Sequence, residues 1–167
     1  MKNSSITLSR LKELLIYNLD SGLFRVKQGG KGRRKPGTIA GWISSQGYRK
    51  IQLDGITYSA HRLVWFYVHG EWPKDQLDHE HGQRADNRIL ELREATNGQN
   101  KANARLHRNS TSGFKGVSWQ KDCQKWRARI QKNGKKASLG LFDTAIEAHQ
   151  AYCDAAAKQY GKFANTG

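Results

Sequence analysis

The chain has 167 residues, with 29 Lys and Arg against 14 Asp and Glu, and its formal net charge is +15. This length suits one ordinary domain or two small ones, and sixteen aromatic residues (five Trp, six Tyr, five Phe) are too many for a disordered basic tail. The charge favours a polyanionic partner, above all nucleic acid. No apolar run approaches the ~18 residues of a membrane span. We therefore expect no membrane partner. Two cysteines exclude a four-cysteine zinc site, and we expect an intracellular protein with reduced thiols.

Basic residues are spread along the whole chain. Residues 1–110 hold 19 basic and 10 acidic side chains (+9), and residues 111–167 hold 10 and 4 (+6). This distribution predicts two basic modules in series rather than a neutral domain with a basic tail.

The first elements follow from capping and turn residues. Thr7 is placed to cap a short helix whose apolar face carries Leu8, Leu11, Leu14 and Leu15. The turn at 20–22 ends that helix, residues 23–27 predict a strand, and the Gly-rich, charged stretch 28–37 predicts a surface loop that offers Arg33, Arg34 and Lys35 to solvent or phosphate.

Two further strands are predicted at 38–44 and 48–53. Asp54-Gly55 then forms a hairpin turn into a strand at 56–59. The run SAHRLVWFYVHG predicts a buried helix that Gly70 ends.

A connector rich in Lys, Arg and Asn, residues 101–112, leads to the second module. Lys101, Arg105 and Arg108 recur at i, i+4 and i+7 and so fall on one helical face. Two interpretations stay open: a solvated helix end, or a linker that follows the DNA backbone.

Alternation replaces the helical period after Gly113. In KWRARIQ, Trp126, Ala128 and Ile130 point one way, and Arg127, Arg129 and Gln131 point the other. Asn133-Gly134 predicts a hairpin, and Thr144 with Glu147 predicts a capping box that opens a final helix ended by Gly161. The small residues of that helix, Ala148, Ala151 and Ala155, allow close packing on a sheet. The module is therefore predicted as three strands and one helix.

Acidic, imidazole and amide side chains concentrate between residues 78 and 100. Zinc binding by His79 and His81 lacks the four nitrogen or sulfur ligands that structural zinc requires. A plain polar turn is the simple alternative. The third interpretation is metal-assisted phosphodiester hydrolysis, because Asp78 and an Asn carbonyl supply the oxygen ligands of a hard divalent ion, and an imidazole beside it accepts the proton of the attacking water.

Residues 60–100 resemble the HNH (His-Asn-His) homing endonucleases of phages and their introns. The resemblance is carried by HRLVW, the Asp78-His79 doublet, Gly-x-x-x-Asp-Asn-Arg at 82–88 and Leu-Arg-x-Ala-Thr-x-x-x-Asn at 92–100. It implies an α+β chain with a ββα-metal nuclease module over residues 1–105.

The same resemblance implies roles for individual residues. Asp78 and Asn100 would hold one Mg²⁺ or Mn²⁺ ion, and His79 would be the general base, leaving 5′-phosphate and 3′-hydroxyl ends. Asn87 would brace the active-site loop, and His61 is interpreted as structural and hydrogen-bonded within the packing of its helix. The chain departs from the family at Glu91, where the family has an Asn that both donates and accepts hydrogen bonds. A loop held differently, and a weakened nuclease, are therefore also expected.

Residues 112–167 resemble the Apetala/ethylene-response-factor (ERF) DNA-binding domain, through SGFKGVSW, KWRARI and the motif GxFDTxxEAxxAY. That resemblance implies a three-stranded sheet placed in the major groove. Arg127 and Arg129 are the expected base readers, and Lys115 and Lys136 the expected phosphate contacts. The other expected DNA contacts are Ser118, Gln120, Gln131 and Ser138, with Arg105 and Arg108 on or beside the basic linker 106–111. Trp119 is interpreted as core, with a DNA-contacting platform as the alternative.

These features together predict a site-specific, homing-type DNA endonuclease. We expect it to be phage-encoded, to act as a monomer on double-stranded DNA in the bacterial cytoplasm, and to need no protein partner. Removal of residues 111–167 is expected to reduce site preference more than bond breaking. The alternative is a DNA-binding protein with a degenerate nuclease module, as Glu91 suggests. RNA binding is weaker, because the sheet offers Arg and Lys rather than stacking aromatics.

Overall fold

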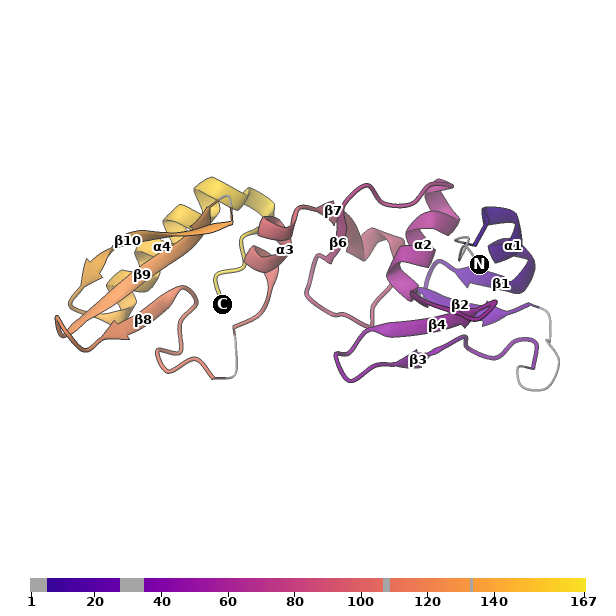
Figure 1. Ribbon diagram of the computed structural model, residues 1–167, viewed down its shortest axis with the longest axis horizontal. Coiled ribbons are helices and arrows are strands. Elements are labelled where there is room, and N and C mark those ends of the chain that lie inside the picture. Colours follow the sequence, from indigo (N-terminus) through magenta and orange to yellow (C-terminus); the bar gives the residue numbers. More distant parts are fainter. Residues whose placement is uncertain (1–5, 28–34, 107–108, 133) are drawn as a thin grey trace. The chain divides into compact units, whose positions relative to one another are not determined.

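A computed structural model describes residues 6–27, 35–106, 109–132 and 134–167, so Arg33, Arg34 and Arg108 lie outside the described part of the chain. The chain forms two compact units, Met1–Glu94 and Ala95–Gly167. Both mix helices with small antiparallel sheets, which confirms the α+β class. Figure 1 labels the elements of both units.

The first unit begins with the capped helix α1, Leu8–Leu14, in which the Thr7 side chain accepts a hydrogen bond from the Arg10 amide. The chain then enters a hairpin of β1 (Leu15–Asn18) and β2 (Leu23–Val26). The leucine pattern predicted Leu15 on the helix and did not indicate β1. Burial alternates along β1, and this short period-two signal was hidden by the leucine periodicity before it.

A second sheet consists of β3 (Trp42–Ile43), β4 (Arg49–Leu53) and β5 (Ile56–Ser59), in the order β3-β4-β5. The strand expected at 38–44 is therefore much shorter, although Ile39 forms a single bridge to Arg25. The predicted turn is present, with both of its residues at positive φ: 45° for Asp54 and 83° for Gly55.

Helix α2, Ala60–His69, ends at Gly70 in the left-handed conformation, as predicted. Its inner face joins the core of this unit, whose largest fully buried apolar side chains are Leu11, Leu15, Phe24, Ile51, Leu63 and Val64. Each such side chain contributes about 1.5–3 kcal/mol when it is removed from water. This core is the support on which the polar segment after α2 rests.

That polar segment contains strand β6 (Gln76–His79), the 3₁₀ turn η1 (Ile89–Glu91) and strand β7 (Leu92–Ala95). Strands β6 and β7 pair as a two-stranded sheet. The loop after β6 and the turn η1 therefore connect two paired strands. This loop holds most of the candidate site.

The second unit opens with α3 (Asn97–Asn103), which begins at a capping box formed by Thr96 and Gln99. The helix ends at Asn103, so the helical face expected to join Lys101 and Arg105 is not formed; the chain is already extended at Ala104 (φ −57°, ψ 142°). The three predicted strands follow as β8 (Val117–Gln120), β9 (Lys125–Lys132) and β10 (Lys135–Phe142).

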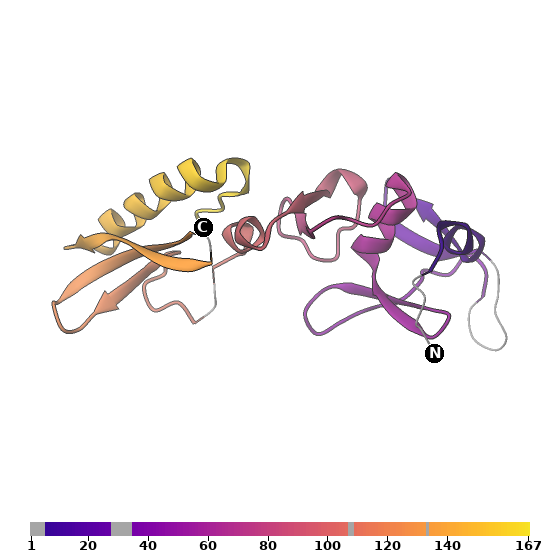
Figure 2. The same ribbon diagram turned by 45° about the horizontal axis from the view of Figure 1, so that its top comes forward.

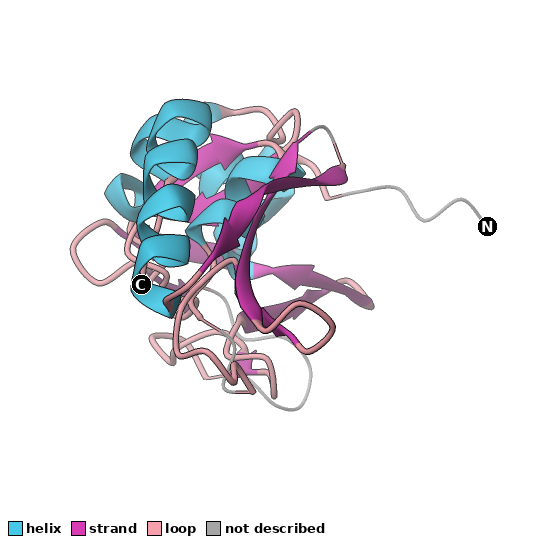
Figure 3. Cartoon of the chain, turned by 90° about the vertical axis from the view of Figure 1, so that its left-hand side faces the viewer, coloured by secondary structure: helices cyan, strands magenta, loops and turns pink. Residues whose placement is uncertain are grey.

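Strand β9 is central, in the order β10-β9-β8, and α4 (Ala145–Tyr160) lies along one face of the sheet (Figures 2 and 3). The short turn η2 (Gly161–Phe163) follows. The predicted capping box and the end at Gly161 are both present. Ala128 and Ile130 are buried towards the helix, and Ala148 and Ala156 are fully buried on the helix side. Small residues thus let α4 approach the sheet closely.

Trp119 is not a core residue. Its side chain is 37% exposed, and its ring packs edge-on against Trp126, the residue opposite it on β9. The alternation placed Trp119 on the helix side of the sheet, but its exposure shows that it is not packed into the core. Among the described residues, no helix combines the length and apolar character needed to cross a bilayer.

Candidate functional site

Strand β6 buries two of the expected catalytic residues. Asp78 is 4% exposed and His79 is 5% exposed, and Asn87, from the loop that follows, is 1% exposed. Buried polar side chains require partners, because removing them from water without hydrogen bonds costs several kcal/mol. Their contacts therefore show how the fold prepares these groups.

The His79 ring faces the side chain of Asn87. Nε2 of His79 lies 3.4 Å from Oδ1 of Asn87, and the Asn87 amide nitrogen donates to the Ala85 carbonyl at 3.2 Å, which fixes the amide with its oxygen towards the ring. An acceptor at this position favours the tautomer with its proton on Nε2, which leaves the lone pair on Nδ1. Burial lowers the pKa of His79, and the hydrogen bond with Asn87, which by itself would raise the pKa, offsets only part of this shift. A neutral imidazole is the form that a general base requires.

Aromatic rings surround His79. The ring centroid of His61, from the first turn of α2, lies 5.3 Å away, and that of Tyr48 lies 5.9 Å away. Burial lowers the pKa of His61 to about 3. Nδ1 of His61 is buried without a hydrogen-bond partner in the described structure, so the hydrogen bond expected for His61 is absent at this atom. His61 is therefore a packing residue whose ring contacts the ring of the proposed base.

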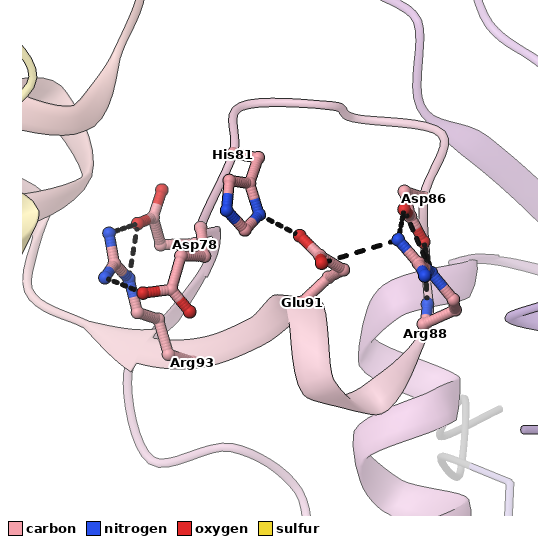
Figure 4. A network of polar contacts seen from close by, with 7 residues as sticks. Asp78, His81, Asp86, Arg88, Glu91 and Arg93 are labelled. Carbon is pink, nitrogen blue, oxygen red and sulfur yellow. Dashed lines mark hydrogen bonds and ion pairs between the residues drawn. The ribbon is translucent and has the colours of Figure 1, made fainter. Parts of the chain in front are cut away.

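Asp78 is paired with an arginine that sequence reasoning missed. Nε and Nη2 of Arg93, on β7, lie 3.0 and 2.9 Å from Oδ2 of Asp78, and Nη1 lies 3.1 Å from Glu80 (Figure 4). One guanidinium thus spans two carboxylates. The available signal was the pairing of β6 with β7, which brings Arg93 beside the doublet once the hairpin is recognised.

Glu91 is held by partners of its own. Its Oε2 lies 2.6 Å from Nδ1 of His81, and its Oε1 lies 3.4 Å from Arg88, which also binds Asp86 at 2.6 Å (Figure 4). The hydrogen bond to Glu91 raises the pKa of His81. Since Asn87 contacts His79 and Glu91 contacts His81, the loop is closed by two separate polar contacts. The sequence departure at Glu91 is accompanied by two partners for its carboxylate, the His81 imidazole and the Arg88 guanidinium.

The β1–β2 hairpin contacts the loop between β6 and η1 through Tyr17 and Gly22. The Tyr17 hydroxyl donates to the Asn87 carbonyl at 2.9 Å and accepts from the Ile89 amide at 3.1 Å. Gly22, at φ +68°, packs directly on the loop, where an added Cβ would lie 2.6 Å from the Asn87 carbonyl carbon and 2.4 Å from the Arg88 nitrogen. Only glycine fits here, because both the backbone angle and the space exclude a side chain.

Asn100, the second expected metal ligand, lies half-buried on α3 in the second unit. Its convergence with Asp78 stays a prediction. The donor chemistry fits a hard ion: a carboxylate and a carboxamide oxygen suit Mg²⁺, which keeps several waters and takes few protein ligands. In the described part of the chain, no cluster of three or more His, Cys, Asp or Glu side chains is arranged for metal binding.

The second unit presents the expected DNA contacts together. Register pairs Ser118 with Arg127, Ser138 with Arg129, and Lys136 with Gln131, so these cross-strand neighbours share the sheet face opposite α4. Arg129 also reaches Ser118, with 3.4 Å between Nη2 and Oγ. A cavity of about 500 Å³ is lined by apolar side chains such as Leu106 and Phe114 together with cations of this face and of the α3–β8 segment, including Lys101, Arg105, Arg129 and Lys136.

Lys115 makes different contacts from those expected. Its ammonium donates to the backbone carbonyls of Ala102, Ala104 and Asn165, all in the second unit. Burial lowers its pKa to about 8. An ammonium with three carbonyl acceptors has used its donors, so the structure gives Lys115 internal contacts, and the expected phosphate contact stays a prediction.

Two family models match the chain in the order that the two units suggest: an HNH endonuclease model over residues 58–102 and an AP2 domain model over residues 112–162. Protein 3.8 of Escherichia phage T7 is 34% identical over 84 residues, which cover 50% of this chain and 69% of that protein. The chain belongs to the HNH endonuclease family. An AP2 domain, the Apetala-type DNA-binding domain, follows its HNH domain. No solved structure matches the chain.

The HNH match includes β6, the loop, β7 and most of α3, and thus every residue assigned to the expected metal site. The AP2 match includes the whole sheet and α4. The two domain matches together suggest a DNA-binding nuclease.

Proposed function

We propose that this protein is a site-specific, homing-type DNA endonuclease that hydrolyses one phosphodiester bond with His79 as the general base. The observation that carries the proposal is the environment of His79: a buried ring whose pKa is lowered, oriented by Asn87 and adjacent to Asp78. A neutral imidazole of this kind accepts a proton from water near neutral pH.

Several residues around the site would hold the base and the adjacent carboxylate in place. Asn87 orients the ring, Tyr17 and Gly22 hold the Asn87 backbone, and Arg93 orients the Asp78 carboxylate. Asp78 and Asn100 would hold one Mg²⁺ or Mn²⁺ ion, in the ββα-metal arrangement of the family. Such an ion, when bound, offsets charge on the phosphate and on the leaving oxygen. The products would carry 5′-phosphate and 3′-hydroxyl ends.

The AP2 domain would select the target. Arg127 and Arg129 are the proposed base readers, because an arginine fork matches the two acceptors of guanine. Lys136, with Arg105 and Lys101 around the same cavity, would contact phosphates. We propose double-stranded DNA as the partner, a monomeric protein, and action in the cytoplasm of a bacterial host, in keeping with the phage relative.

Plasmid cleavage tests the proposal. The full chain with Mg²⁺ or Mn²⁺ is expected to cut supercoiled DNA, and His79→Ala is expected to slow cutting by about 10²–10⁴-fold, the usual contribution of a general base. His69→Ala is the matched control, because His69 is an exposed histidine in the last turn of α2, outside the candidate site. DNA binding should be the same in both variants. Equal cutting by the parent and His79→Ala would disprove the role of His79.

A DNA-binding protein without nuclease activity is the second candidate. Two observations favour it: Glu91 stands where the family has Asn, and Arg93 occupies an oxygen of Asp78. It predicts tight DNA binding and no cutting by the parent with either metal. The same plasmid experiment therefore separates the two functions.

A further inference from the structure

Helix α3 carries Asn100 but is too short to be stable alone. It has seven residues, Asn97–Asn103, and isolated helices below about 12 residues are marginal in water. Its amino end is closed by the capping box of Thr96 and Gln99. Its carboxyl end leaves carbonyls without partners inside the helix, and these need donors from elsewhere.

Lys115 supplies those donors. Its ammonium, which lies after the connector and before β8, binds the carbonyls of Ala102 and Ala104 at the end of α3. It also binds the Asn165 carbonyl at 2.8 Å. A lysine at a helix carboxyl end is favourable for the helix dipole as well as for the hydrogen bonds.

The carboxyl-terminal segment completes this contact. The Asn165 side chain donates to the Asn103 carbonyl at 3.0 Å, and its backbone amide donates to the Ala102 carbonyl at 3.3 Å. Figures 1 and 2 both show this segment running beside α3. The last carbonyls of α3 are therefore bound by Lys115 and Asn165. In the sequence, Lys115 precedes the AP2 sheet and helix, and Asn165 follows them.

The carboxyl end of α3, which Lys115 and Asn165 bind, lies one helical turn after Asn100. The Ala104 amide donates to the Asn100 carbonyl at 3.1 Å, so the backbone that Lys115 binds is the backbone that fixes Asn100. Ala102 and Asn103 are buried between these contacts. The AP2 domain thus holds a helix that belongs to the HNH match.

We propose that Lys115 is a positioning residue of the nuclease: it fixes the turn of α3 that presents Asn100 to the metal ion. The proposal rests on the proposed function, since it takes Asn100 as a ligand. It changes the expected division of labour between the domains, because removal of residues 111–167 would remove both Lys115 and Asn165 and so impair cutting as well as target selection.

Lys115→Met in the full chain tests this role, with Lys158→Met as the control. Lys158 is an exposed lysine on α4, so its replacement removes the same charge without touching α3. Hydrogen exchange should become faster at the α3 amides in Lys115→Met only. The Mg²⁺ concentration for half-maximal cutting should rise by about 10–100-fold, as for other residues that support metal ligands. DNA binding in EDTA should match that of Lys158→Met.

A second pair of variants guards against misfolding. Asn165→Ala removes the side-chain contact to Asn103 and leaves Lys115 in place, so it should give the same changes in smaller measure, and Lys115→Arg should restore part of the α3 protection. Unchanged α3 exchange in Lys115→Met overturns the proposal. DNA binding reduced as much as cutting also overturns it and makes Lys115 a phosphate contact. If the parent cuts no DNA, the proposed function fails, and the exchange measurement still decides whether Lys115 orders α3.

Discussion

The two units build their cores from side chains of different size. The first unit buries Leu, Ile and Phe side chains, and its core is large enough to bury Asp78, His79 and Asn87 as well. The second unit buries mainly alanines between its helix and sheet, with Ile130, Tyr152 and Phe163 as its larger members. Arg127, Arg129 and Lys136 lie on the sheet face opposite α4.

This difference matches the two kinds of chemistry. A general base benefits from burial, because burial keeps the imidazole neutral and its partners fixed. A DNA-reading face needs exposed cations that reach phosphates and base edges, and it needs only a thin support behind the sheet. Polar burial, rather than charge, therefore distinguishes the candidate reaction site in this basic chain.

The largest expected effect comes from replacing Gly22, which packs against the backbone of the loop that holds Asn87. Gly22→Ala would place a Cβ 2.4–2.6 Å from the loop backbone at φ +68°. We expect a loss of about 2–4 kcal/mol of unfolding free energy from strain and collision, together with slower cutting. Gly37→Ala is the matched control, because Gly37 has φ +81° and nothing within 4 Å of the added Cβ. Thermal unfolding and plasmid cutting measure both effects.

Target binding through the second unit should survive Gly22→Ala. Equal stability and cutting for the two alanine variants would contradict the packing of the hairpin on the loop.

Acid should act on the first unit through His61. Its pKa is about 3 in the folded chain and 6.5 ordinarily, so below pH 6.5 the unfolded chain binds a proton that the folded chain does not. Stability is therefore lost as the pH falls, by about 2–3 kcal/mol between pH 6.5 and 4.5. Urea unfolding at the two pH values measures the loss, which His61→Gln should reduce. Burial also lowers the pKa of His79, so part of the loss should remain. An identical loss in the variant would contradict the burial of His61.

A smaller and more local effect is expected at the reading face. Arg129→Ala should relax preference at one base pair by about 1–3 kcal/mol, whereas Lys136→Ala should weaken all sequences alike. Selection from a random duplex library, followed by binding at several salt concentrations, distinguishes the two outcomes. Uniform weakening by Arg129→Ala would make it a phosphate contact instead.

Much of the fold could be predicted from local signals. Gly70 ends α2, Thr144 and Glu147 cap α4, and the alternation around Ala128 assigns the two sheet faces. These features depend on a few neighbouring residues. The β1 strand and the end of α3 were missed because tertiary contacts, rather than local periodicity, decide them.

The candidate site was only half predictable. The Asp78-His79 doublet and Asn87 were visible as a motif, and Asn87 does contact His79. Arg93, Tyr17 and Gly22 were not identified, because their contacts join residues that are 15 or more positions apart in the chain. Lys115 was assigned from a family position to DNA, but a helix end 11–13 residues before it takes its ammonium.

We propose that His79 acts as the general base beside a metal ion that Asp78 and Asn100 would hold. Anomalous scattering from Mn²⁺ in a crystal of the full chain with cleavable duplex DNA tests it most directly. The account predicts one Mn²⁺ ion at about 2.0–2.2 Å from oxygens of Asp78 and Asn100, with a DNA phosphate on the same ion and Nδ1 of His79 facing a water. An ion bound elsewhere, or Asp78 still paired only with Arg93 while DNA occupies the site, would contradict it.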